Sequence, residues 1–117
     1  MGRFRDVTVT WDAQARRIVC TPDIAEVYYR HPAGPSCVRW VVESMPRSAK
    51  RVEVKWETES PFLHMGAEIR DKKLCLLATG NRGKQGLYKY MVLFLDKDDN
   101  VVAAIDPGVR DEPEPKP

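Results

Sequence analysis

The sequence predicts an all-β fold, an antiparallel β-sandwich of seven to eight short strands. Polar and apolar residues alternate with a period of two in several short runs, which is typical of strands with one exposed face. Segments rich in Pro, Gly, Asp and Asn separate these runs, and no window of helical length shows a 3.6-residue period with caps. Many short strands in roughly 100 residues are typical of two packed antiparallel sheets.

The clearest alternation lies in residues 51–57, where Val52, Val54 and Trp56 share one face and charged residues occupy the other. Residues 37–43 repeat the pattern, with Trp40 between two valines. These apolar faces are expected to form the core. The predicted strands, in chain order, are Val7–Trp11, Arg17–Cys20, Ala25–Tyr29, Cys37–Glu43, Arg51–Glu57, Leu74–Ala78, Leu87–Leu95 and Val101–Ile105.

The last two predicted strands form a β-hairpin around a polar turn at residues 96–100. Tyr88, Tyr90, Val92 and Phe94 lie on one face of the strand at 87–95, and the other face is also mostly apolar. A strand with two apolar faces is expected in the middle of a sheet, buried on both sides.

The segment Gly86-Leu-Tyr88-Lys-Tyr90 resembles the G-x-Y-x-C start of an immunoglobulin F strand, with Tyr90 in the place of the cysteine. Trp40 resembles the core tryptophan of strand C. The resemblance implies an immunoglobulin-like sandwich in which the Tyr88 hydroxyl bonds to the chain upstream and forms a tyrosine corner. The alternative is that Tyr88 is an ordinary cross-strand aromatic.

Four short motifs, in this order, resemble a group of small uncharacterised bacterial β-sandwich proteins. The motifs are Cys37-Val-Arg-Trp40, Glu59-Ser-Pro-Phe62, Gly86-Leu-Tyr-Lys-Tyr90 and Ile105-Asp-Pro107. The resemblance covers most of residues 5–110, and Val109 stands where the group usually has a bulky aliphatic residue. Because the motifs are turn and strand markers, they imply a fold and a bacterial source but no reaction.

The 117 residues predict one domain, residues 1–110, followed by an acidic, proline-rich disordered tail, residues 111–117. The net charge is +2. The tail holds three of the 17 acidic residues and one of the 19 basic ones, which leaves +4 on residues 1–110. Such a mild basic excess is weak evidence for nucleic-acid binding, because dedicated binders cluster their cations more strongly.

The compartment predicted is the cytoplasm, with no membrane association. The N-terminal residues contain no continuous apolar stretch, and the longest apolar run, residues 90–95, is far too short to span a bilayer. Cys20, Cys37 and Cys75 are odd in number, match no zinc or redox spacing and have apolar neighbours, so they are predicted to be small buried residues. A Cys20–Cys37 disulfide is the alternative, which would require an oxidising compartment.

No metal or other cofactor is predicted. The run Asp96-Lys-Asp98-Asp-Asn100 begins like a calcium loop, but Val101 and Pro107 replace the required glycine and glutamate. These short polar side chains are instead expected to satisfy the backbone of a turn. Copper is excluded because no histidine follows Cys75. His31 and His64 are both predicted to lie in loops.

No enzymatic activity is predicted. The serines and cysteines that a histidine could activate lie in no local motif such as G-x-S-x-G. These residues are Ser36, Ser44, Ser48, Ser60, Cys20, Cys37 and Cys75.

The loop from Thr79 to Gly86 is the one stretch with a composition suited to binding an anion. It holds three glycines, whose backbone N–H groups can converge on an anion, together with Arg82 and Lys84. It has no GK[ST] ending and no following helix, so it is not a nucleotide-triphosphate loop. A flexible turn is the alternative. Lys72 and Lys73 are the next candidates for anion contact.

The function predicted is non-catalytic binding of a protein partner through loops or a sheet edge, because sandwiches offer both as recognition surfaces. Weak binding of an anion or nucleic acid through the basic loop is the second hypothesis, and a hydrolase is the third. The chain is expected to be a monomer or a weak homo-oligomer.

Overall fold

The computed structural model describes residues 3–32 and 34–115, which contain ten β-strands and no helix. The predicted all-β class is therefore confirmed, whereas the predicted number of strands, seven to eight, is too low. In chain order the strands are β1 (Phe4–Asp12), β2 (Arg17–Thr21), β3 (Ile24–Tyr28), β4 (Cys37–Val42), β5 (Arg51–Trp56), β6 (Phe62–Arg70), β7 (Lys73–Asn81), β8 (Gly86–Leu95), β9 (Val101–Ile105) and β10 (Gly108–Glu112).

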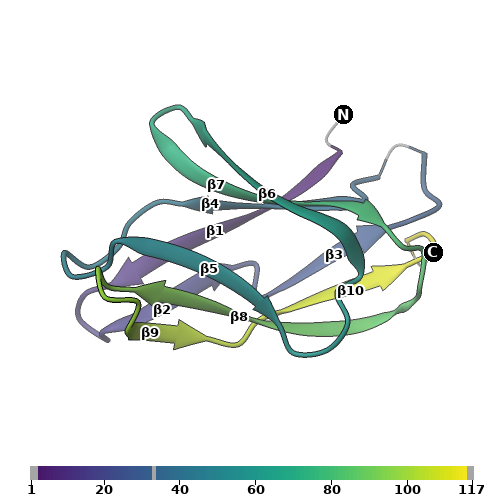
Figure 1. Ribbon diagram of the computed structural model, residues 1–117. Helices are drawn as coiled ribbons and strands as arrows, with labels where there is room; N and C mark the ends of the chain where they lie inside the picture. Colours follow the sequence, from purple (N-terminus) through teal and green to yellow (C-terminus); the bar gives the residue numbers. More distant parts are fainter. Residues whose placement is uncertain (1–2, 33, 116–117) are drawn as a thin grey trace.

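The strands form two sheets that pack face to face (Figure 1). The first has the order β2-β1-β4-β7-β6, and the second has the order β3-β10-β8-β5, with β9 paired to the C-terminal half of β8. Two pairs, β1–β4 and β3–β10, are parallel, so the prediction of a purely antiparallel arrangement is wrong. Alternation within a strand determines which side chains face the core but carries no information about the direction of the neighbouring strand.

The core lies between the sheets and is built from the apolar faces that the alternation predicts. Val38, Trp40 and Val42 of β4 are buried, as are Val7 and Val9 of β1. The second sheet contributes the inner face of β8 and residues from its neighbours. The inward orientation of these faces is confirmed.

The outer face of β8 is only partly covered. Tyr90, Val92 and Phe94 on the inner face are fully buried, but Leu87 on the other face is 51% exposed. The central position of β8 is confirmed, since β5 lies on one side and β9 and β10 on the other. The prediction that both faces are buried is wrong, because no third layer covers the second sheet in the part of the chain described.

Three aromatic rings join the two sheets at the centre of the core. Trp40 and Tyr90 pack edge to face, with centroids 5.3 Å apart, and Trp56 lies within 6.2 Å of Trp40 and 5.1 Å of Tyr90. The indole N–H of Trp40 donates a 2.8 Å hydrogen bond to the Tyr90 hydroxyl. Burial raises the pKa of Tyr90. Tyr90 thus links the sheets at the position where the immunoglobulin pattern has a cysteine.

The bond predicted for Tyr88 is present. Its hydroxyl donates to the backbone carbonyl of Lys84, four residues upstream, at 2.8 Å. Tyr88 therefore ties the start of β8 to the preceding loop, as a tyrosine corner does.

Replacing Tyr88 with phenylalanine is expected to lower the free energy of unfolding by about 0.5–1.5 kcal/mol, because one intramolecular hydrogen bond is lost while the ring stays in place. Water can reach the Lys84 carbonyl, which limits the loss. Tyr29→Phe is the matched control, since the Tyr29 hydroxyl makes no hydrogen bond to any described residue. Urea denaturation measures both variants, and equal losses would contradict a structural role for the bond. Tyr90→Phe is unsuitable as a control because it removes the bond from Trp40.

The C-terminal strand β10 lies partly in the segment expected to be a disordered tail. Asp111 and Glu112 belong to β10, and Asp111 is fully buried. The strand runs parallel to β3 and antiparallel to β8. The prediction that disorder begins at residue 111 is therefore wrong, because backbone pairing to two neighbours holds a segment with little apolar surface of its own. Residues 116–117 lie outside the described part of the chain.

Candidate functional site

The basic residues proposed for anion binding do not form one site. Arg82 and Lys84 follow β7, and each lies 3.6 Å from the same carboxylate oxygen of Glu59. Lys72 and Lys73 lie at the other end of β7, which is roughly 27 Å long for nine extended residues. The structure therefore divides the four candidates into two separated pairs.

Each pair is also partly engaged within the chain. Glu59 partly neutralises Arg82 and Lys84, and the loop between them turns at Gly83, whose φ is 72°. Its backbone N–H donates to the Asn81 side chain at 2.8 Å, as expected of an ordered turn. Lys73 contacts Glu43 at 2.6 Å, and this hydrogen bond raises the pKa of Lys73. Exposed ion pairs of this kind contribute little to stability.

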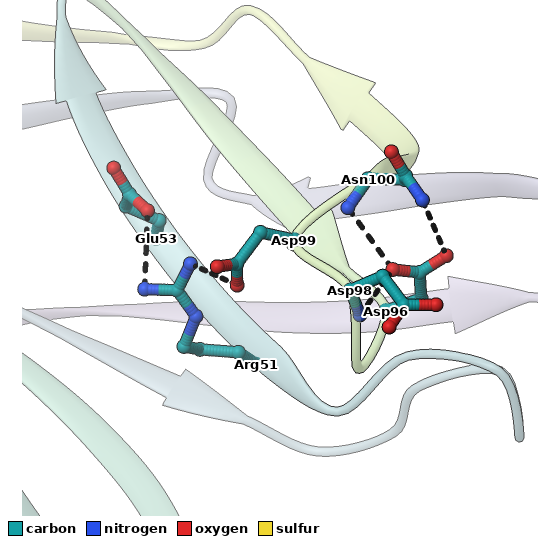
Figure 2. Close-up of polar contacts among 6 residues, drawn as sticks. All are labelled: Arg51, Glu53, Asp96, Asp98, Asp99 and Asn100. Carbon is teal, nitrogen blue, oxygen red and sulfur yellow. Dashed lines mark hydrogen bonds and ion pairs between the residues drawn. The ribbon is translucent and has the colours of Figure 1, made fainter.

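The acidic hairpin tip between β8 and β9 is a closed turn (Figure 2). The Asp96 carboxylate accepts hydrogen bonds from the backbone N–H groups of Asp98, at 2.8 Å, and Asn100, at 3.0 Å. These bonds lower the pKa of Asp96, with Asn100 the larger contributor. Asp99 adopts a φ of 64° and pairs with Arg51 at 2.7 Å. The local role predicted for these side chains is confirmed.

The three cysteines are free thiols, each less than 10% exposed, as the sequence predicts. Burial raises the pKa of the Cys20 thiol to about 12, and Asp23 acts in the same direction. A nucleophilic cysteine instead needs a lowered pKa. Among the described residues, no hydrogen bond joins a histidine to a serine or cysteine, and no group of three His, Cys, Asp or Glu side chains is placed to hold a metal ion.

Asp111, which was predicted to lie in the disordered tail, is a buried carboxyl group. One oxygen accepts a 3.1 Å hydrogen bond from the Asn81 amide, and the other has no partner among the described residues. Burial raises the pKa of Asp111 to about 6, against the opposing effect of Asn81. Because Asn81 also donates to the Ser36 carbonyl, these groups connect β10 and β7 to the segment before β4.

The two sheets are open on the side where their edge strands β5 and β6 lie, and we call this region the open side. Here a shallow cleft of about 330 Å³ lies between β5 and β6. Its lining is mostly apolar and comes from both sheets. The lining residues are Val52, Glu53, Val54, Met65, Gly66, Ala67 and Leu76.

β6 carries a row of exposed apolar side chains beside this cleft. Leu63, Met65, Ala67 and Ile69 alternate along the strand and so share one face. Leu63 is 58% exposed, Met65 44% and Ile69 71%. Met65 pairs with Ala78, Ala67 with Leu76 and Ile69 with Leu74 of β7, which shows that this face continues the inner face of the first sheet. The β6–β7 hairpin extends away from the second sheet toward its tip (Figure 1), so its apolar face is left uncovered.

β6 is not among the strands predicted from the sequence. The prediction that His64 lies in a loop is wrong, since His64 pairs with Thr79 in β7. The signal was present as the alternation of Leu63, Met65 and Ile69. Gly66 and the Ser-Pro pair before Phe62 obscured it, because glycine and proline are typical of turns.

A scan against models of protein families and a search among curated proteins both found no match to this sequence. Within residues 3–32 and 34–115, no helical segment has the length and apolar character needed to cross a bilayer.

Proposed function

We propose that this protein is a non-catalytic binding module that recognises a protein partner through its open side. The observation that carries the proposal is the row of exposed apolar side chains on β6, led by Ile69 at 71% exposure and Leu63 at 58%. An apolar row next to a free sheet edge is costly to leave in water and favours association.

The chemistry of this surface favours a polypeptide over an anion. The cleft is wide and apolar, and its one ionisable lining residue is Glu53. A free strand edge supplies backbone donors and acceptors, with which an added strand can form hydrogen bonds. The alternating apolar side chains of such a strand can also cover the apolar face of β6. The basic loop supports the anion hypothesis less well, because Arg82 and Lys84 share the Glu59 carboxylate.

The test is capture of partners by the tagged protein from a lysate, at low and high salt, with nuclease treatment as a control. Phosphate-driven binding weakens steeply as the salt concentration rises, whereas an apolar interface does not. Capture is expected to survive high salt and nuclease. Ile69→Glu is expected to abolish it, because a charge would be buried in the interface.

Val101→Glu is the matched control, since Val101 is also an exposed aliphatic residue on an edge strand, at 58% exposure on β9. It is expected to leave capture unchanged. Capture that disappears at high salt or after nuclease treatment, and that requires Arg82 and Lys84, would contradict the proposal in favour of anion or nucleic-acid binding.

The proposal includes an immunoglobulin-like arrangement of the sandwich and a cytoplasmic location. The Tyr88 corner and the buried Trp40 support the first. Three free, buried thiols are consistent with the second, since disulfides are rare in the cytosol. The similarity to small bacterial β-sandwich proteins belongs to the same proposal.

A further inference from the structure

The free edge of β6 lacks the features that keep other edges from pairing. β6 has nine residues, whereas the edge strands β2, β3 and β9 have five and β5 has six. β5 carries Arg51, Glu53 and Lys55 in alternation, an arrangement that discourages pairing. From Phe62 to Ala67, β6 has no lysine, no proline and no acidic residue.

The sequence of β6 is complementary to itself. When two copies of a strand pair antiparallel about a two-fold axis normal to the sheet, one residue lies at the axis, and residues equally distant from it oppose each other. All nine residues overlap only when the axis passes through Gly66. Leu63 then opposes Ile69, and Met65 opposes Ala67.

The polar residues match in the same register. His64 opposes Glu68 of the second copy, and the imidazole N–H can donate to the carboxylate. Neither residue forms an ion pair with another described residue. Moving the axis to residue 67 sets His64 against Arg70, and moving it to residue 68 sets Glu68 against itself. Both shifts lose the favourable pair.

Gly66 is a second, independent observation that indicates a close approach by another chain. A Cβ atom added there would meet no heavy atom within 4 Å, and Gly66 is not among the glycines with positive φ. Nothing within the described chain therefore requires glycine at this position, although glycine weakens a strand interior. Such a glycine often marks a place where another backbone approaches closely. At a two-fold axis, identical side chains would face each other, and glycine removes that conflict.

We infer that the partner of β6 is a second copy of this chain, paired antiparallel along Phe62–Arg70 about an axis at Gly66. The inference rests on the proposed function, because it names the partner for the same surface. The first sheet of one copy would join the first sheet of the other into one continuous sheet. The apolar rows of the two copies would then lie side by side. Pairing one strand per chain buries less than the roughly 1,200 Å² of a standard interface, so the dimer is weak and depends on concentration.

The test is sedimentation velocity of the full chain over a concentration series. The wild type is expected to shift from monomer to dimer. Gly66→Lys sets two ammonium groups together at the axis and is expected to raise the dissociation constant at least about tenfold. Ala104→Lys, which adds the same charge at an exposed position on β9, is the control and is expected to dimerise like the wild type.

An exchange of charges distinguishes a specific register from general disruption. His64→Glu places two carboxylates opposite each other, and Glu68→Lys places a lysine opposite His64, so each variant alone is expected to dimerise more weakly. The double variant pairs the introduced glutamate with the introduced lysine and is expected to recover dimerisation. Misfolding cannot explain a recovery of dimerisation, because the double variant contains both of the changes that weaken dimerisation when made singly.

Three results separate this inference from the proposed function. A wild type that stays monomeric but captures other proteins through Ile69 overturns the dimer and supports the proposed function. A dimer that Gly66→Lys and Ala104→Lys weaken equally, or that the double variant does not recover, overturns the register and hence the inference. If Ile69→Glu changes neither capture nor self-association, the open side is not a binding surface and the proposed function also fails.

Discussion

Replacing Trp40 with alanine is expected to lower the free energy of unfolding by about 3–5 kcal/mol, the range for removing a large buried ring. Trp40 is 0% exposed and packs against Trp56 and Tyr90. The variant also leaves the Tyr90 hydroxyl without its 2.8 Å partner in a site from which water is excluded. The loss of this bond adds to the cost of the cavity, which favours the upper half of the range.

Guanidinium denaturation followed by far-ultraviolet circular dichroism measures this loss. Trp11→Ala is the control, because Trp11 is only partly buried and contacts Phe94 at a centroid distance of 6.3 Å. It is expected to cost less than Trp40→Ala. If Trp40→Ala does not fold, Trp40→Phe is measured instead, with a smaller loss expected because most of the ring volume is kept. A loss below about 1 kcal/mol for Trp40→Ala would contradict the central role of this residue.

Ending the chain after Arg110 is expected to cost about 2–4 kcal/mol. Besides the strand pairing, four hydrogen bonds would lose their acceptors, and each is worth about 0.5–1.5 kcal/mol. Glu112 accepts from the backbone N–H of Tyr29 at 3.0 Å, and Pro113 accepts from that of Arg30 at 2.8 Å. Asp111 accepts from the Asn81 amide at 3.1 Å, and the Glu112 carboxylate accepts from the Gln85 amide. A disordered tail beginning at residue 111 would instead leave stability unchanged.

Ending the chain after Pro113 is the control for this truncation. It keeps all four acceptors and removes only residues 114–117, of which Glu114 and Pro115 are exposed. The change expected is within about 0.5 kcal/mol of the full chain, as for most surface changes. Thermal and urea unfolding measure both truncations. If both unfold at the same midpoint, β10 does not stabilise the fold beyond Arg110.

In the strands with regular alternation, the spacing of apolar residues predicts which side chains face the core. In β4 and β5, Trp40 and Val52 lie inward as the period of two requires. The inner face of β8 was also predictable, because Tyr90 and Phe94 lie on the same face of one long apolar run. The turn at Asp96 was also predictable, since its side chain bonds only to residues within four positions. These features depend on the spacing of residues within one strand or turn, so the sequence of that segment is enough to predict them.

The choice of neighbouring strands and the exposure of the sheet edges depend on contacts between residues that are far apart in the sequence. β10 has one clear apolar signal, Val109, and exists because β3 and β8 supply backbone partners on both sides. The Trp40–Tyr90 bond joins residues 50 positions apart. The separation of Lys72 and Lys73 from Arg82 and Lys84 follows instead from the extended conformation of β7. The exposed face of β6 was decided in the same way. Its side chains alternate like those of a core strand, but β5 and β6 end their sheets on the same side and leave that face uncovered.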